Sequence, residues 1–65
     1  MVWFKTGRFY VAKGARAQYL IEQAGGLWRL HIKQGEDGPT LHATGDKVGA
    51  LQDKAARYDD QAQRA

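Results

Sequence analysis

The segment that most restricts the fold of this chain is residues 17–33, which predicts a β-hairpin with a defined register. Its midpoint is Gly25-Gly26, and glycine adopts at low cost the positive φ that tight hairpin turns require. With the turn placed there, three pairs face each other across the two arms: Gln23 with Trp28, Ile21 with Leu30, and Tyr19 with Ile32. Hydrophobic and polar residues alternate on both arms, so one face of the hairpin is apolar and the other is mixed.

Further elements are expected on both sides of this hairpin. Residues 8–12 predict a strand, and residues 2–5 either extend it through a bulge or form a strand of their own. Residues 40–43 either form a short fourth strand or only place Leu41 against the edge of the core. A helix is expected over about residues 44–62, with Thr44 as its N-cap and Asp46 in its first turn. Its apolar stripe consists of Val48, Leu51, Ala55, Tyr58 and Ala62. The chain therefore predicts one small α+β domain over residues 1–65, in which a three- or four-stranded antiparallel meander packs on one C-terminal helix.

Length and charge limit what such a domain can do. A chain of 65 residues without cysteine has no disulfide to reinforce a small core, which makes oligomerisation or a partner a natural source of stability. Residues 1–33 hold six Lys or Arg and one Glu, whereas residues 34–65 hold four Lys or Arg and six Asp or Glu. The sheet half is therefore basic and the helical half is mildly acidic. A basic face either attracts an acidic partner or serves only for solubility.

The chain has few of the residue types that catalytic sites use. The chain has no serine, asparagine or cysteine, and its only histidines are His31 and His42. Asp59 and Asp60 are neighbours on the predicted helix and point about 100° apart, so we expect them to solvate the helix rather than share a proton. The glycines fit no phosphate-binding spacing. We expect no enzymatic activity, no metal site, no cofactor and no small-molecule substrate. With no apolar run of membrane-spanning length and no signal peptide, we expect a cytoplasmic protein that does not enter a membrane.

The candidate site is the sheet face that a single helix leaves open. Because neighbours in a strand alternate, one of Trp3 and Phe4 and one of Phe9 and Tyr10 must point to this face. The predicted partner-binding face consists of Leu20, Leu27, Arg29, His31, Lys33, Trp3 and Tyr10. Trp3, Arg29 and either Phe9 or Tyr10 are its predicted anchors, since interfaces are rich in aromatic residues and arginine. The alternative is that the N-terminal segment folds over this face and fills it.

A second hypothesis is nucleic-acid binding. The hairpin arm Gly26-x-Trp28-x-Leu30 and the helix with Leu51 and Ala55 resemble, in their order, the arm-binding domains of tyrosine recombinases, which insert a three-stranded sheet into the major groove. This resemblance implies that Arg8, Arg16, Arg29 and Lys33 contact DNA, mostly at phosphates. The face differs from that family's strongly basic sheet at Leu20 and Glu22.

In composition the chain also resembles small accessory proteins of actinobacterial phages, those of mycobacteriophages in particular. The resemblance lies in its richness in Ala, Gly, Arg and Asp, its Gly-x-Trp hairpin and its Thr-led helix. It implies a protein that binds a host protein or DNA. The leading expectation is a non-enzymatic interaction module that binds itself or a host protein through the open sheet face. The alternative is a DNA-binding protein that uses the basic sheet face.

Overall fold

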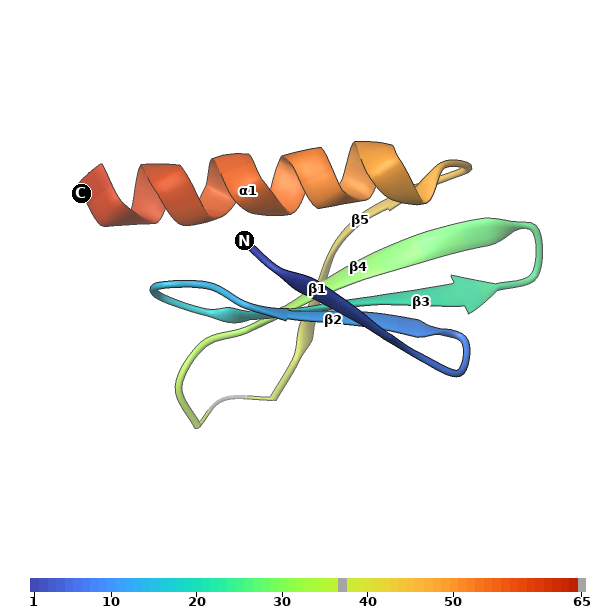
Figure 1. Cartoon of the computed structure of the whole chain (residues 1–65), viewed down its shortest axis with the longest axis horizontal. Helices are drawn as coiled ribbons and strands as arrows, with labels where there is room; N and C mark the ends of the chain where they lie inside the picture. Colours follow the sequence, from blue (N-terminus) through green and yellow to red (C-terminus); the bar gives the residue numbers. More distant parts are fainter. Residues whose placement is uncertain (37, 65) are drawn as a thin grey trace.

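The fold is a five-stranded antiparallel sheet with one helix on one face (Figure 1). The computed structural model describes residues 1–36 and 38–64, with side chains up to residue 61. The strands are β1 (Trp3–Thr6), β2 (Phe9–Lys13), β3 (Gln18–Ala24), β4 (Leu27–Lys33) and β5 (Thr40–Gly45), and the helix is α1 (Val48–Arg64). The strands pair in sequence order, as in a meander. The predicted α+β class is confirmed, with five strands where three or four are expected.

The additional strand comes from the N-terminal segment, which forms a hairpin of its own. Thr6 pairs with Phe9, and Gly7 lies between them with φ of +60°. This conformation suits glycine and fits the first central position of a tight hairpin turn. Residues 3–6 therefore form an edge strand beside β2. The alternative in which this segment folds over the open face is wrong, since its backbone is used in pairing with β2.

The central hairpin has the register that its sequence predicts. The structure pairs Tyr19 with Ile32, Ile21 with Leu30, and Gln23 with Trp28. Gly25 has φ of +64°, whereas Gly26 does not have a positive φ, so one glycine of the pair provides the unusual conformation. The apolar residues of both arms face α1, as the alternation requires.

The helix begins at Val48, four residues later than predicted. Thr44 is not its N-cap, because Thr44 belongs to β5 and pairs with Arg29. Asp46 precedes the helix, and the first turn contains no acidic residue. The predicted strand at residues 40–43 is instead extended to Gly45, with a register shift opposite Leu30 and His31. Strand pairing with β4 thus takes precedence over the local capping signal.

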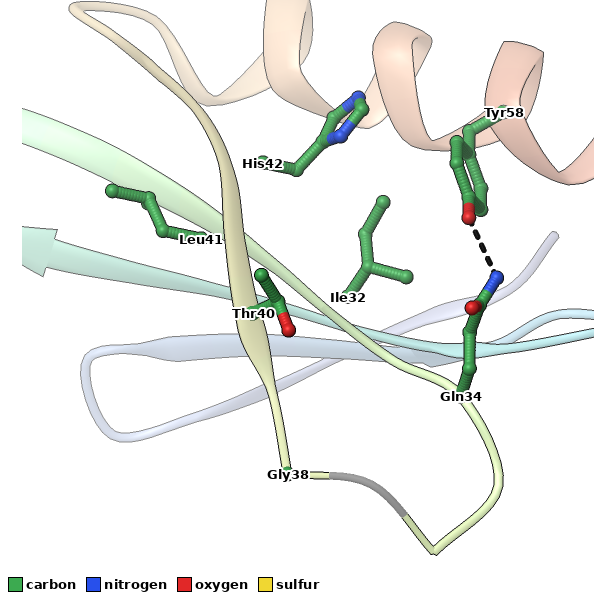
Figure 2. A pocket seen from close by; sticks show the side chains of 7 residues that line it. All are labelled: Ile32, Gln34, Gly38, Thr40, Leu41, His42 and Tyr58. Carbon is green, nitrogen blue, oxygen red and sulfur yellow. Dashed lines mark hydrogen bonds between the residues drawn. The ribbon is translucent and has the colours of Figure 1, made fainter.

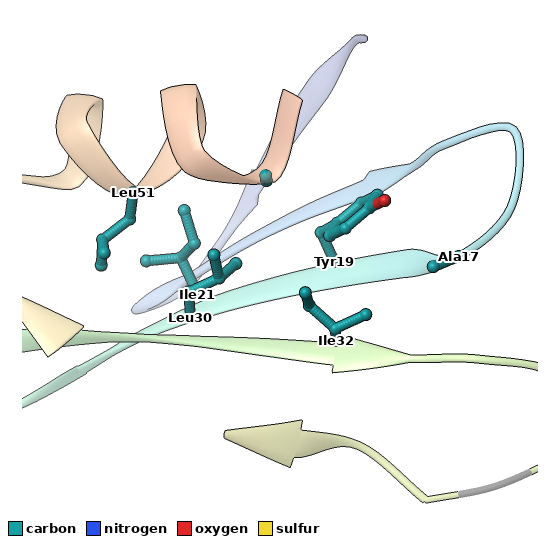
Figure 3. Packing of buried hydrophobic residues seen from close by; sticks show 7 residues of the cluster. Ala17, Tyr19, Ile21, Leu30, Ile32 and Leu51 are labelled. Carbon is teal, nitrogen blue, oxygen red and sulfur yellow. The ribbon is translucent and has the colours of Figure 1, made fainter. Parts of the chain in front are cut away.

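The core lies between α1 and strands β3, β4 and β5 (Figure 3). Leu51 and Ala55 of the helix are buried, and Val48 and Tyr58 are partly buried against the same cluster, as the predicted stripe requires. The side chain of Ala62, the last predicted member of the stripe, is outside the described residues. The buried cluster consists of Ala17, Tyr19, Ile21, Leu30, Ile32, Leu51 and Ala55. Among the described elements, this packing leaves the opposite face of the sheet without a covering layer.

Candidate functional site

The sheet face opposite α1, called here the open face, carries one line of mainly apolar side chains across all five strands. Pairing places one residue of each strand at the same level, and these five form the cross-strand row: Phe4, Val11, Leu20, His31 and Leu41. Phe4 is 66% exposed, Leu41 53% and Val11 38%. Leu20 and His31, in the centre, are partly buried. Large apolar side chains are therefore in contact with solvent from one edge of the sheet to the other.

The next level of the open face is more polar. It carries Phe9, Glu22, Arg29 and Thr44 in register across β2 to β5. His31 Nε2 and Glu22 Oε1 are 3.0 Å apart, so the imidazole N–H donates to the carboxylate. This diagonal contact holds the His31 ring in the cross-strand row. It also pairs the one acidic residue that the strands place on this face.

Five of the seven predicted partner-binding residues lie on the open face, and two do not. Leu20, Leu27, Arg29, His31 and Lys33 share its side of the pleat. The prediction is wrong for Trp3 and Tyr10, which lie on the other face. Their pairing with Ala12 and Ile21 puts them on the side of the core, where both are partly buried.

Different aromatic residues take their place on the open face. Tyr10 packs edge-to-face with Trp28, with ring centroids 5.6 Å apart, which keeps it on the helix side. Its neighbour Phe9 therefore points to the open face, and Phe4 does so beside Trp3. The predicted face omits Val11 and Leu41, and of the pair Trp3 and Phe4 it names the residue that faces the core. Only the Thr6-Gly7-Arg8-Phe9 turn, which fixes the register of β1, could have identified Phe4.

A basic pocket lies at the end of the open face, beside the turn between β2 and β3. It measures about 210 Å³, and its charged lining residues are Lys13, Arg16 and Lys33. Gly14 and Gly35 also line it. Of the four predicted DNA contacts, Arg16 and Lys33 meet here. Arg29 lies further along the face in β4, and Arg8 lies in the β1–β2 turn. The four therefore do not form one compact patch.

A buried carboxylate on α1 holds the turn that carries Arg16. Asp59 of α1 is 8% exposed, and it accepts hydrogen bonds from Tyr19 Oη at 2.9 Å and from the backbone N–H of Ala15 and Arg16 at 3.2 and 3.3 Å. Gly14 allows this approach, since a Cβ there would lie 2.3 Å from Asp59 Oδ1. The expectation that Asp59 is a solvated surface residue is wrong, whereas Asp60 is exposed as expected.

This network shifts the pKa values of both its titratable members. Burial acts to raise the pKa of the Asp59 carboxyl, but hydrogen bonds from Ala15, Tyr19 and Arg16 outweigh it and hold the pKa below its ordinary value. Burial raises the pKa of the Tyr19 hydroxyl well above 10, and the hydrogen bond to Asp59 adds to the effect. The pair is thus held as a carboxylate and a neutral phenol over the neutral pH range.

Two further hollows adjoin the sheet. One, of about 190 Å³, lies on the open face among Val11, Leu20, His31 and Pro39, and it also touches Gln18 and Lys33. The other, of about 240 Å³, lies where α1 meets β5, with Tyr58 and His42 in its wall (Figure 2). There Gln34 Nε2 donates to Tyr58 Oη at 2.6 Å. Both are smaller than most small-molecule sites.

Two classes of site have no counterpart in the part of the chain that the structure describes. No three His, Asp or Glu residues there are placed to hold a metal ion. No helix there has both the length and the apolar character needed to cross a membrane.

Comparisons with family models, with curated proteins and with solved structures gave no match for this chain. The functional conclusion therefore depends on the open face itself.

Proposed function

We propose that the protein binds another protein through its open sheet face. The observation that carries this proposal is the cross-strand row, in which Phe4, Val11 and Leu41 expose large apolar side chains on a face that none of the described elements covers. Exposed apolar side chains that are contiguous, rather than scattered, are typical of interaction surfaces. Leu27, 49% exposed at the hairpin tip, extends the same face.

The composition of the face fits a protein partner better than a nucleic-acid backbone. Phosphates are recognised by cations and N–H groups. The four predicted phosphate contacts do not form one compact patch, since Arg8 and Arg16 lie in turns. The centre of the face is apolar, with Val11 paired to Leu20. An apolar centre with charged residues at its ends is instead the usual arrangement of protein interfaces. The side chains described on this face suggest binding rather than catalysis, so the proposed role is binding.

The proposal is tested by a selection that does not require the partner to be identified first. A displayed library of random twelve-residue peptides is selected on the purified protein, and the enriched peptides are measured by fluorescence anisotropy. We expect the double variant Phe4→Asp/Leu41→Asp to weaken their binding at least tenfold. The control Ala56→Asp, on the exposed side of α1, is expected to change it less than twofold. Equal binding by both variants would contradict the proposal.

Self-association and DNA binding are measured on the same samples. A dimer in sedimentation velocity that dissociates in Phe4→Asp/Leu41→Asp would support the proposal, with a second copy as the partner. Labelled random duplex DNA is titrated at two salt concentrations. Micromolar binding that weakens steeply with salt and persists in Phe4→Asp/Leu41→Asp would instead favour the nucleic-acid alternative.

A further inference from the structure

The basic pocket and the apolar hollow of the open face form one continuous surface. Gln18 and Lys33 line both. A chain lying in the hollow against Val11 and Leu20 therefore reaches the pocket of Lys13, Arg16 and Lys33 within a few residues. The open face thus offers an apolar contact and a cationic contact side by side.

We propose that the partner is an acidic protein segment with apolar side chains. This inference rests on the protein-binding function proposed above. The apolar side chains of the segment cover the hollow and the cross-strand row, and one or more of its carboxylates enter the basic pocket. Arginine and lysine bind carboxylates through charge-assisted hydrogen bonds, which are stronger than neutral ones.

The charge of the face argues for this occupant over a second copy. The strands place Lys13, Arg29 and Lys33 on the open face, and against them only Glu22, which His31 already engages. Two copies packed through this face would bring cation against cation. An acidic segment is complementary to it, and complementarity steers association and suppresses wrong partners.

The basic pocket is also rigidly built. The Asp59 carboxylate accepts from two consecutive backbone N–H groups of the turn and from Tyr19, so the backbone that carries Arg16 is tied to the helix. Asp59 does bring one negative charge behind the turn, but three cations line the pocket. A site fixed before binding loses less entropy when the partner arrives.

The experiment uses the same peptide selection and asks what the enriched peptides share. We expect Asp or Glu close to a large apolar residue in most of them. Arg16→Glu and Lys33→Glu are each expected to weaken the best peptide at least tenfold. The charge-matched control Arg57→Glu, on the exposed side of α1, is expected to change binding less than twofold. Replacing the peptide's acids by lysine should restore binding to the Lys33→Glu variant.

The outcomes separate this inference from the proposed function. Peptides that need Phe4 and Leu41 but carry no acids, and that bind Arg16→Glu and Lys33→Glu like the wild type, would overturn the acidic partner and leave the binding face intact. Absence of any peptide that binds through the open face would overturn both. Duplex DNA that displaces the peptides, and whose own binding is lost in Lys33→Glu, would assign the pocket to phosphates instead. Circular dichroism confirms that each variant is folded.

Discussion

The two faces of the sheet use hydrophobic residues in opposite ways. On the helix side, Tyr19, Ile21 and Leu30 are completely buried, and their partners come from the same chain. On the open side, Phe4 and Leu41 occupy equivalent places in the pleat but remain more than half exposed. The same alternation thus produces a core on one side and an exposed apolar surface on the other. The difference shows that residues of one apolar character can share a pleated sheet and still differ in burial, because the position of the helix decides which face of the sheet is covered.

The largest expected difference in stability is between a leucine on the helix side of the sheet and a leucine on the open face. Leu51→Ala removes a side chain that is 1% exposed, and we expect a loss of about 2–5 kcal/mol in the free energy of unfolding. Leu41→Ala, at 53% exposure, should change it by less than about 0.5 kcal/mol. Urea unfolding followed by circular dichroism measures both.

Because Leu51→Ala can unfold so small a domain altogether, Ile21→Val provides a milder probe. It should cost about 0.5–1.5 kcal/mol. Equal effects of Leu41→Ala and Ile21→Val would show that the open face is buried in solution, which would abolish the contrast between the two sides.

A second prediction concerns the turn between β2 and β3, where Gly14 lies against Asp59 of α1. Gly14→Ala places a methyl group against Asp59 and Tyr19, so the carboxylate must move and its hydrogen bonds to the turn must weaken. We expect a loss of about 3 kcal/mol, at the upper end of overpacking effects. Gly26→Ala is the control, since no atom lies within 4 Å of the added methyl group. Equal thermal stability of the two variants would contradict the close contact.

The sequence predicts those parts of the fold and of the candidate site in which the contacting residues are close together along the chain. The central hairpin was predicted pair by pair, because a glycine turn and alternating residues are local signals. Trp3 and Tyr10 are predicted on the wrong face, because each has an adjacent aromatic residue, Phe4 or Phe9, and alternation gives no contrast within such a pair. The Asp59 network was invisible, because its donors lie 40 to 44 residues away and Asp59-Asp60 looks like an ordinary polar stretch.

On the open face, too, only the residues that belong to the central hairpin could be predicted from local pattern. Leu20 and Arg29 were placed correctly from the hairpin register. Leu41 was missed because its position depends on a register shift opposite Leu30 and His31, which no local pattern reveals. The cross-strand row is therefore a property of the whole sheet.

The third prediction tests the Asp59 network through its pH dependence. The pKa of Asp59 lies below the ordinary value of 3.8 in the folded protein, so its contribution to stability is present above that pH and is lost as the pH falls through the folded pKa. We expect Asp59→Asn to lose about 2 kcal/mol at pH 7, because buried donors lose a charged partner. The loss should shrink toward pH 2. Asp53→Asn, on the exposed side of α1, is the matched control and should follow the wild type.

The stability of a Tyr19 variant at alkaline pH tests the same network. Its pKa is raised above 10.0, so the stability that it contributes is complete below pH 10 and declines as the pH rises beyond it. Tyr19→Phe should therefore show a flatter stability profile than the wild type as the pH rises above 10. Identical slopes would show that the pKa of the Tyr19 hydroxyl is not raised in the folded protein.

The smallest prediction is a gain in stability that leaves the open face unchanged. Gly49 lies in the first turns of α1, is exposed, and has no atom within 4 Å of an added Cβ, so no close contact explains this glycine. Gly49→Ala should therefore stabilise the domain by about 0.5–1 kcal/mol, because alanine loses less backbone entropy in a helix. Thermal unfolding measures the gain, and peptide binding by the same variant should remain within twofold of the wild type. Since the helix supports the covered side of the sheet only, a large change in binding would mean that the two sides are coupled, and that the open face depends on how firmly the helix packs behind it.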